Sequence, residues 1–117
     1  MKSYTDIEQS RKLAKILPLE SADMYFAGHQ SIVNPKEWDY EDLPKVRGKY
    51  IAFDDKRVFF PCWSLAALLG ALPSATLDSS ENHRYRVYCN ERFTDWHDNP
   101  IDACVAMLLK LHEQKIL

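Results

Sequence analysis

The chain has 117 residues, the size of one domain, and its 46% hydrophobic and 27% charged residues are typical of a folded globular protein. A formal net charge of −2 gives no overall basic field of the kind that attracts nucleic acids. The first residues do not resemble a signal peptide, and no apolar run is long enough to cross a bilayer. We therefore expect one domain over residues 1–117 with no membrane partner.

The N-terminal part is expected to form a helix and a strand. Thr5 and Glu8 match a capping box, in which each side chain bonds the free backbone N–H of the other residue, so a helix should begin there. Alternating apolar residues over 22–27 predict a short strand. Residues 29–48 then predict a long connection.

The middle of the chain predicts a hairpin followed by a helix. Apolar residues flank the polar turn 54–57, which favours a hairpin over residues 49–60. Residues 64–72 are typical of a short helix that begins after a strand, and residues 74–83 of a polar loop.

A second hairpin is predicted over residues 84–97. Asn90 suits its tight turn because asparagine tolerates a positive φ. This register places Arg86 opposite Asp95, a favourable charge pair.

The last helix is predicted to begin near Pro100. Asp98 or Asn99 can cap it, and Pro100 suits a first turn. Its apolar stripe consists of Ile101, Cys104, Val105, Leu108 and Leu111. We expect this stripe to pack on the helix over residues 64–72.

Two apolar residues of the last helix, Met107 and Leu109, lie outside this stripe. Either the other helices cover them, or a second copy of the chain does so in a symmetric homodimer. We favour the monomer, because three helices on one sheet face can shield a central helix.

These elements together predict an α+β fold. We expect a small antiparallel sheet of two hairpins plus one further strand, with about three helices packed on one face.

Cys62 is a candidate catalytic nucleophile. It lies just before a predicted helix, where the helix dipole can stabilise a thiolate, and His83 or His97 could serve as its base. Alternatively, Cys62 fills a packed corner between Pro61 and Trp63. We favour packing, because free cysteine is among the most often buried residue types.

No cofactor or metal site is predicted. The chain contains neither the close Cys or His pairs of zinc sites nor a phosphate-binding loop, and it has only three glycines. The three cysteines are irregularly spaced, which predicts free thiols and a cytoplasmic protein. An enzyme is disfavoured.

Two groups of residues could bind a partner. Trp38 and Tyr40 in the acidic, aromatic run 37–42 could anchor a protein, or could fold back over a sheet edge. Arg84, Arg86 and Tyr88 on the second hairpin could bind nucleic acid, which we disfavour because Asp95 would partly neutralise Arg86.

Three segments carry a resemblance to a known family. They are Ser-Ala-Asp-Met-Tyr at 21–25, Pro-Cys-Trp-Ser-Leu-Ala-Ala-Leu-Leu-Gly-Ala-Leu-Pro at 61–73, and Asp-Asn-Pro-Ile-Asp-Ala-Cys-Val-Ala-Met at 98–107. With them the chain resembles a family of small uncharacterised Bacteroidetes proteins, often associated with prophages or mobile elements. The resemblance implies an accessory protein and assigns no reaction, cofactor or catalytic residue.

From these features we expect a non-catalytic binding or accessory protein. The alternatives are a thiol-dependent enzyme that uses Cys62 and a nucleic-acid-binding module that uses the hairpin over residues 84–97.

Overall fold

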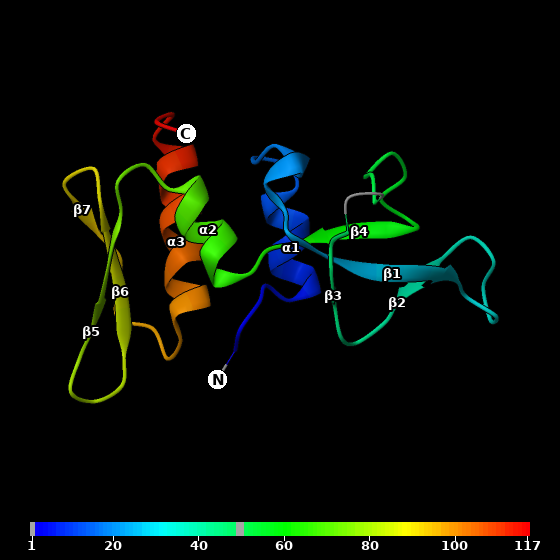
Figure 1. Ribbon diagram of the computed structural model, residues 1–117, viewed down its shortest axis with the longest axis horizontal. Coiled ribbons are helices and arrows are strands. Elements are labelled where there is room, and N and C mark those ends of the chain that lie inside the picture. Colours follow the sequence, from blue (N-terminus) through cyan, green and yellow to red (C-terminus); the bar gives the residue numbers. More distant parts are fainter. Residues whose placement is uncertain (1, 49–50) are drawn as a thin grey trace.

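The computed structural model describes residues 2–48 and 51–117 and confirms an α+β fold. The molecule is elongated, with extents of 46 × 30 × 26 Å (Figure 1). No helix in the described part of the chain has the length and apolarity needed to span a membrane. The elements are, in order, α1 (Ile7–Leu13), a 3-10 turn (Leu19–Ser21), β1 (Met24–Gln30), β2 (Trp38–Tyr40), β3 (Lys45–Val46), β4 (Phe59–Cys62), α2 (Leu65–Ala71), β5 (Thr76–Ser79), β6 (Tyr85–Cys89), β7 (Arg92–Phe93) and α3 (Pro100–Glu113).

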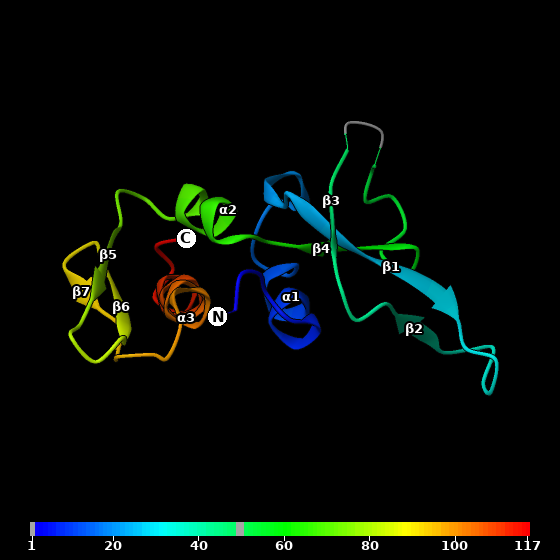
Figure 2. The same ribbon diagram turned by 60° about the horizontal axis from the view of Figure 1, so that its bottom comes forward.

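The strands form two antiparallel sheets instead of the one sheet expected from the sequence. In one sheet β1 is central, with β2 and β3 along one edge and β4 along the other. The other sheet has the order β5-β6-β7. The helices lie between the two sheets, so that the layers run from β5-β6-β7 through α2 and α3 to α1 and then to the β1 sheet (Figures 1 and 2).

The predicted hairpin over residues 49–60 is wrong. Its second strand corresponds to β4, but β4 pairs with β1 in the register Phe26↔Phe60. Residues 51–57 contain no strand, and residues 49–50 lie outside the described part of the chain. The polar turn does form, because the N–H groups of Val58 and Phe59 donate to the carbonyl of Asp55, but it leads the chain into β4 and not back along a local partner.

The long connection predicted over residues 29–48 contains two strands, β2 and β3, and β1 continues through Gly28 to Gln30. Gly28 permits this arrangement. A Cβ at this position would clash with the carbonyl oxygen of Arg57 and lie 2.8 Å from the ring of Tyr40. Glycine is needed here for the close approach of two other segments.

The capping box is shifted by one residue from the prediction. Asp6 is the N-cap of α1 and accepts from the N–H of Gln9, while the Gln9 side chain accepts from the N–H of Asp6. Thr5 is instead fully buried against β4. Both residue pairs fit the sequence pattern, and the burial of Thr5 decides between them.

The loop predicted over residues 74–83 contains β5, which pairs with β6. The second hairpin forms around Asn90 and Glu91, with φ values of 53° and 64°. Its register shifts by one residue near Tyr85, which bridges to His97.

Helix α3 lies at the centre of the core. Asn99 caps it and Pro100 occupies its first turn, as predicted. It packs on α2, β6 and α1. The expected packing on α2 is confirmed, since Leu68 of α2 and Leu108 of α3 are fully buried in one hydrophobic cluster. Of the two apolar residues outside the stripe, Met107 is fully buried and Leu109 is partly buried.

Candidate functional site

Cys62 lies in a closed environment at the end of β4. Its side chain is 0% exposed and donates a hydrogen bond to the carbonyl oxygen of Thr5 at 3.4 Å, while the Thr5 hydroxyl donates to its sulfur at 3.6 Å. Burial raises the pKa of Cys62 to about 11. The thiol is therefore protonated at neutral pH, which is the opposite of what a nucleophilic cysteine needs.

The two histidines proposed as bases for Cys62 lie elsewhere. His83 is exposed in the turn between β5 and β6, with a φ of 57°. His97 is held by its backbone, which exchanges two hydrogen bonds with Tyr85. Among the described residues, neither histidine bonds to Cys62, whose thiol bonds to Thr5 of the N-terminal segment. The geometry provides no support for a thiol–imidazole pair.

No metal site emerges within residues 2–48 and 51–117, where no three His, Cys, Asp or Glu side chains gather closely enough to hold an ion. The three cysteines are free and buried. Burial raises the pKa of Cys104 to about 12. Cys104 therefore acts as a small apolar residue of the core.

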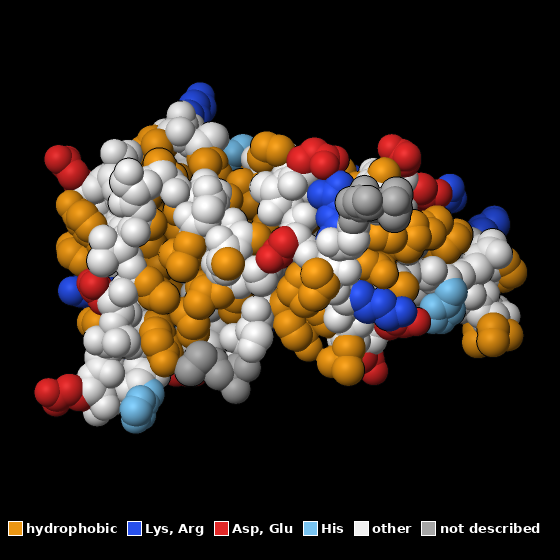
Figure 3. All heavy atoms as spheres, viewed as in Figure 1, with side chains coloured by type: hydrophobic (Ala, Val, Ile, Leu, Met, Phe, Trp, Pro, Cys, Tyr) orange, Lys and Arg blue, Asp and Glu red, His pale blue; other side chains and the backbone are white. Residues whose placement is uncertain are grey.

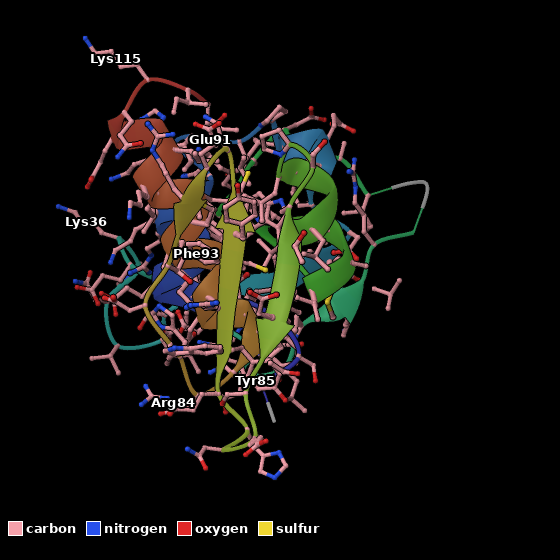
Figure 4. The ribbon with its side chains drawn as sticks, turned by 90° about the vertical axis from the view of Figure 1, so that its left-hand side faces the viewer. Lys36, Arg84, Tyr85, Glu91, Phe93 and Lys115 are labelled. Carbon is pink, nitrogen blue, oxygen red and sulfur yellow. The ribbon has the colours of Figure 1, made fainter. Side chains whose placement is uncertain are left out.

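The outer face of β5-β6-β7 carries the cationic and aromatic residues that suggested nucleic-acid binding (Figure 4). The predicted pair of Arg86 with Asp95 is wrong. Arg86 pairs instead with Asp78 on β5, with 3.2 Å between the guanidinium Nε and the carboxylate. The register of β5 places these two residues directly opposite each other. The Arg86 guanidinium also stacks 4.2 Å from the ring centre of Phe93 and 4.6 Å from that of Trp96.

The neighbouring side chains on this face have partners of their own. Arg84 donates to the carbonyl of Trp96 at 2.7 Å, and the ring of Tyr88 lies 4.7 Å from that of Phe93. These cations and rings thus contact one another within the protein, while Phe93 and Trp96 remain 47% and 37% exposed.

Trp38 and Tyr40 fold back on their own sheet. They belong to β2, and both are half-buried. Arg57 lies over the ring of Trp38, with 5.5 Å to its centre. The Tyr40 hydroxyl donates to the carbonyl of Lys56 at 3.0 Å, and its ring packs edge-on against Phe60. Both residues therefore contact the turn before β4, as in the alternative in which they fold back over the sheet.

The most exposed apolar residues of the described chain lie instead at the end of the β1–β2 hairpin. Ile32 and Val33 are 98% and 95% exposed. The hairpin projects from the body of the molecule as an arm, and we call residues 31–37 the arm tip (Figures 1 and 2). Hydrophobic side chains are visible at its outer end (Figure 3).

The arm tip is held by its own hydrogen bonds. The N–H of Ser31 donates to the carbonyl of Glu37, and the N–H of Glu37 donates to the carbonyl of Asn34, each at 2.9 Å. The Asn34 side chain accepts from the N–H of Lys36 at 3.2 Å, and the Gln30 amide donates to the carbonyl of Pro35 at 2.7 Å. These bonds order the backbone around Ile32 and Val33 without covering their side chains.

The arm tip itself has no net charge, since Lys36 offsets Glu37, but the residues that follow it are acidic. Residues 31–42 contain four carboxylates, Glu37, Asp39, Glu41 and Asp42, against one lysine, which gives a net charge of −3. All four of these residues are exposed. Lys45 is a nearby counter-charge, 3.7 Å from Glu41.

The sequence analysis did not identify Ile32 and Val33 as site residues. The available signal was a β-branched pair next to Asn-Pro inside an otherwise polar connection. Comparisons of the chain with protein-family models, with curated proteins and with solved structures gave no match.

Proposed function

We propose that this chain is a non-catalytic binding module whose arm tip inserts into an apolar socket on a partner protein. The observation that carries the proposal is the almost complete exposure of Ile32 and Val33 on a hydrogen-bonded loop. Fully burying such a side chain contributes about 1.5–3 kcal/mol. An ordered loop also loses little conformational freedom when it binds.

The net charge of the arm over residues 31–42 supports a protein partner over other classes. Four carboxylates against one lysine over residues 31–42 disfavour contact of the arm with anionic lipid headgroups or nucleic-acid phosphates. A protein socket bordered by lysine and arginine side chains is complementary to this surface.

The cellular setting that we propose is an accessory role in a phage or another mobile element of Bacteroidetes, in the cytoplasm. The support for the element is the resemblance carried by residues 21–25, 61–73 and 98–107, and the support for the compartment is three free cysteines. The gene should lie among genes of an integrated phage or another mobile element. Neighbours that are housekeeping genes in several genomes would contradict this role.

The arm tip can be tested by photocrosslinking. Benzoylphenylalanine at position 33 should give a specific adduct with one protein in cells of the source organism, whereas the same probe at position 116, which is also exposed, should not. The adduct identifies the partner, which is then purified for binding measurements.

Calorimetry with the purified partner then decides the proposal. The double variant Ile32→Ser, Val33→Ser should weaken binding at least about tenfold, because it removes both apolar anchors. The control variant Ile116→Ser, Leu117→Ser removes two exposed apolar side chains elsewhere and should bind as the wild type does. Unchanged affinity of the arm variant, or equal losses in both variants, would refute the arm as the binding site.

A further inference from the structure

The sheet edges formed by β4, β7 and β5 differ in how their backbone groups are used. On the outer edge of β4, Phe59 donates to Asp55, Pro61 has no N–H, and Trp63 donates to the Thr5 hydroxyl. Next to β7, the carbonyls of Phe93 and Trp96 accept from Lys110 and Arg84. These two edges are therefore closed to a further strand.

The outer edge of β5 is open. The N–H of Ser80 donates to the carbonyl of Arg84, so Ser80 and Arg84 form a hydrogen-bonded pair of the antiparallel ladder. Because such pairs alternate along the strands, Asp78 with Arg86 and Thr76 with Tyr88 are hydrogen-bonded pairs as well. The N–H and C=O groups of Leu77 and Ser79 consequently point away from β6. Within the described part of the chain these outward groups have no hydrogen-bond partner. β5 contains no proline or lysine, and its one charged residue, Asp78, is paired with Arg86 of β6.

We propose that two copies of the chain pair through β5 in an antiparallel arrangement centred on Leu77, which joins their three-stranded sheets into one of six strands. In this register Leu77 of each copy bonds Leu77 of the other, and Ser79 bonds Ala75. Thr76 of each copy faces Asp78 of the other copy across a pair without hydrogen bonds, where side chains lie closest.

Repulsion between the Asp78 carboxylates favours this register over the register shifted by one residue. A pairing centred on Asp78 would place the two Asp78 carboxylates directly opposite each other, which is unfavourable. The register centred on Leu77 separates them and gives each one a threonine hydroxyl. On the outer face, the ion pair between Asp78 and Arg86 at 3.2 Å stays intact in both copies.

The pairing makes a specific prediction for charge substitutions at position 76, which is exposed. Thr76→Asp places like charges opposite each other twice by symmetry and should weaken the dimer about tenfold, whereas Thr76→Lys creates two opposite-charge pairs and should tighten it by a similar factor. Asn90→Asp and Asp95→Asn make the same changes in net charge away from β5. These controls should leave the dimer affinity unchanged.

The experiment combines sedimentation equilibrium with amide hydrogen exchange. The amides of Leu77 and Ser79 should become protected as the protein concentration rises, while Asp78, which bonds β6 within one copy, should not change. Opposite shifts of the dimerisation constant for Thr76→Asp and Thr76→Lys support the register. A chain that stays monomeric to about millimolar concentration, a dimer with unprotected Leu77 and Ser79 amides, or a dimer that dissociates on Leu109→Glu would each overturn the proposal. None of these results bears on the binding of the arm tip.

Discussion

The substitution Thr5→Val tests the buried contact between the N-terminal segment and β4. Thr5 is fully buried, and its hydroxyl oxygen accepts from the N–H of Trp63 at 3.1 Å and shares a hydrogen bond of 2.8 Å with the Ser10 hydroxyl. Valine keeps the shape of the side chain but removes these bonds. A buried donor without a partner costs about 1–3 kcal/mol, and a lost neutral hydrogen bond about 0.5–1.5 kcal/mol. We therefore expect the free energy of unfolding to fall by about 2–4 kcal/mol.

Urea unfolding followed by tryptophan fluorescence measures this loss. Thr76→Val is the matched control, because Thr76 is exposed, and it should change stability by less than about 0.5 kcal/mol. Ser10→Ala should cost less than Thr5→Val, since it leaves the bond from Trp63 in place. A loss below about 0.5 kcal/mol for Thr5→Val would refute the reasoning, because the Trp63 N–H would then have found another acceptor.

Three further outcomes follow from the core and its polar border. Leu108→Ala should cost about 2–5 kcal/mol in urea unfolding, because the side chain is fully buried, and a loss below about 0.5 kcal/mol would contradict this. Cys62 should resist iodoacetamide at pH 8 in the folded protein and react after unfolding, because burial raises its pKa to about 11. Peptide mass spectrometry measures the modification, and rapid modification of the folded protein would contradict the burial of this thiol. Although burial acts in the opposite direction, hydrogen bonds from Gln9, Lys2 and Asn99 hold the pKa of Asp102 below its usual value. A carboxyl pKa that is lower in the folded protein than in the unfolded chain, where it is about 4, stabilises the fold above that pH, and this contribution is lost as the pH falls through the folded pKa. Asp102→Asn should therefore weaken the dependence of the free energy of unfolding on pH below about pH 4. An unchanged pH dependence would contradict the assignment.

Local signals in the sequence were sufficient for several elements. Asn99 and Pro100 predicted the start of α3, and Asn90 predicted the tight turn that joins β6 to β7. In these cases the deciding interactions lie within a few residues along the chain. The packing of α2 on α3 was also predictable, since each helix has a clear apolar stripe.

Contacts between distant segments explain the errors. The partner of β4 is β1, more than 30 residues earlier in the chain, and the turn at Asp55 gives the same local signal whether or not a hairpin follows. Arg86 pairs with Asp78 and not with Asp95, because β5 was not recognised as a strand. A propensity pattern carries no information on which of two strands will be the neighbour.

The arm tip was not predictable for a different reason. Ile32 and Val33 have the composition of a buried segment, and only the fold shows that nothing covers them. Trp38 and Tyr40 looked like better anchors in the sequence, but Arg57, Lys56 and Phe60 already contact them.

The separation of the arm tip from the core has an evolutionary consequence. Ile32 and Val33 contribute almost nothing to the hydrophobic cluster around α3, so replacing them leaves the fold intact. Mutations usually compete with folding stability, but this pair is free of that competition. With the arm tip as the proposed binding site, a lineage could therefore exchange these two side chains, and with them the partner protein, without altering the residues that form the core.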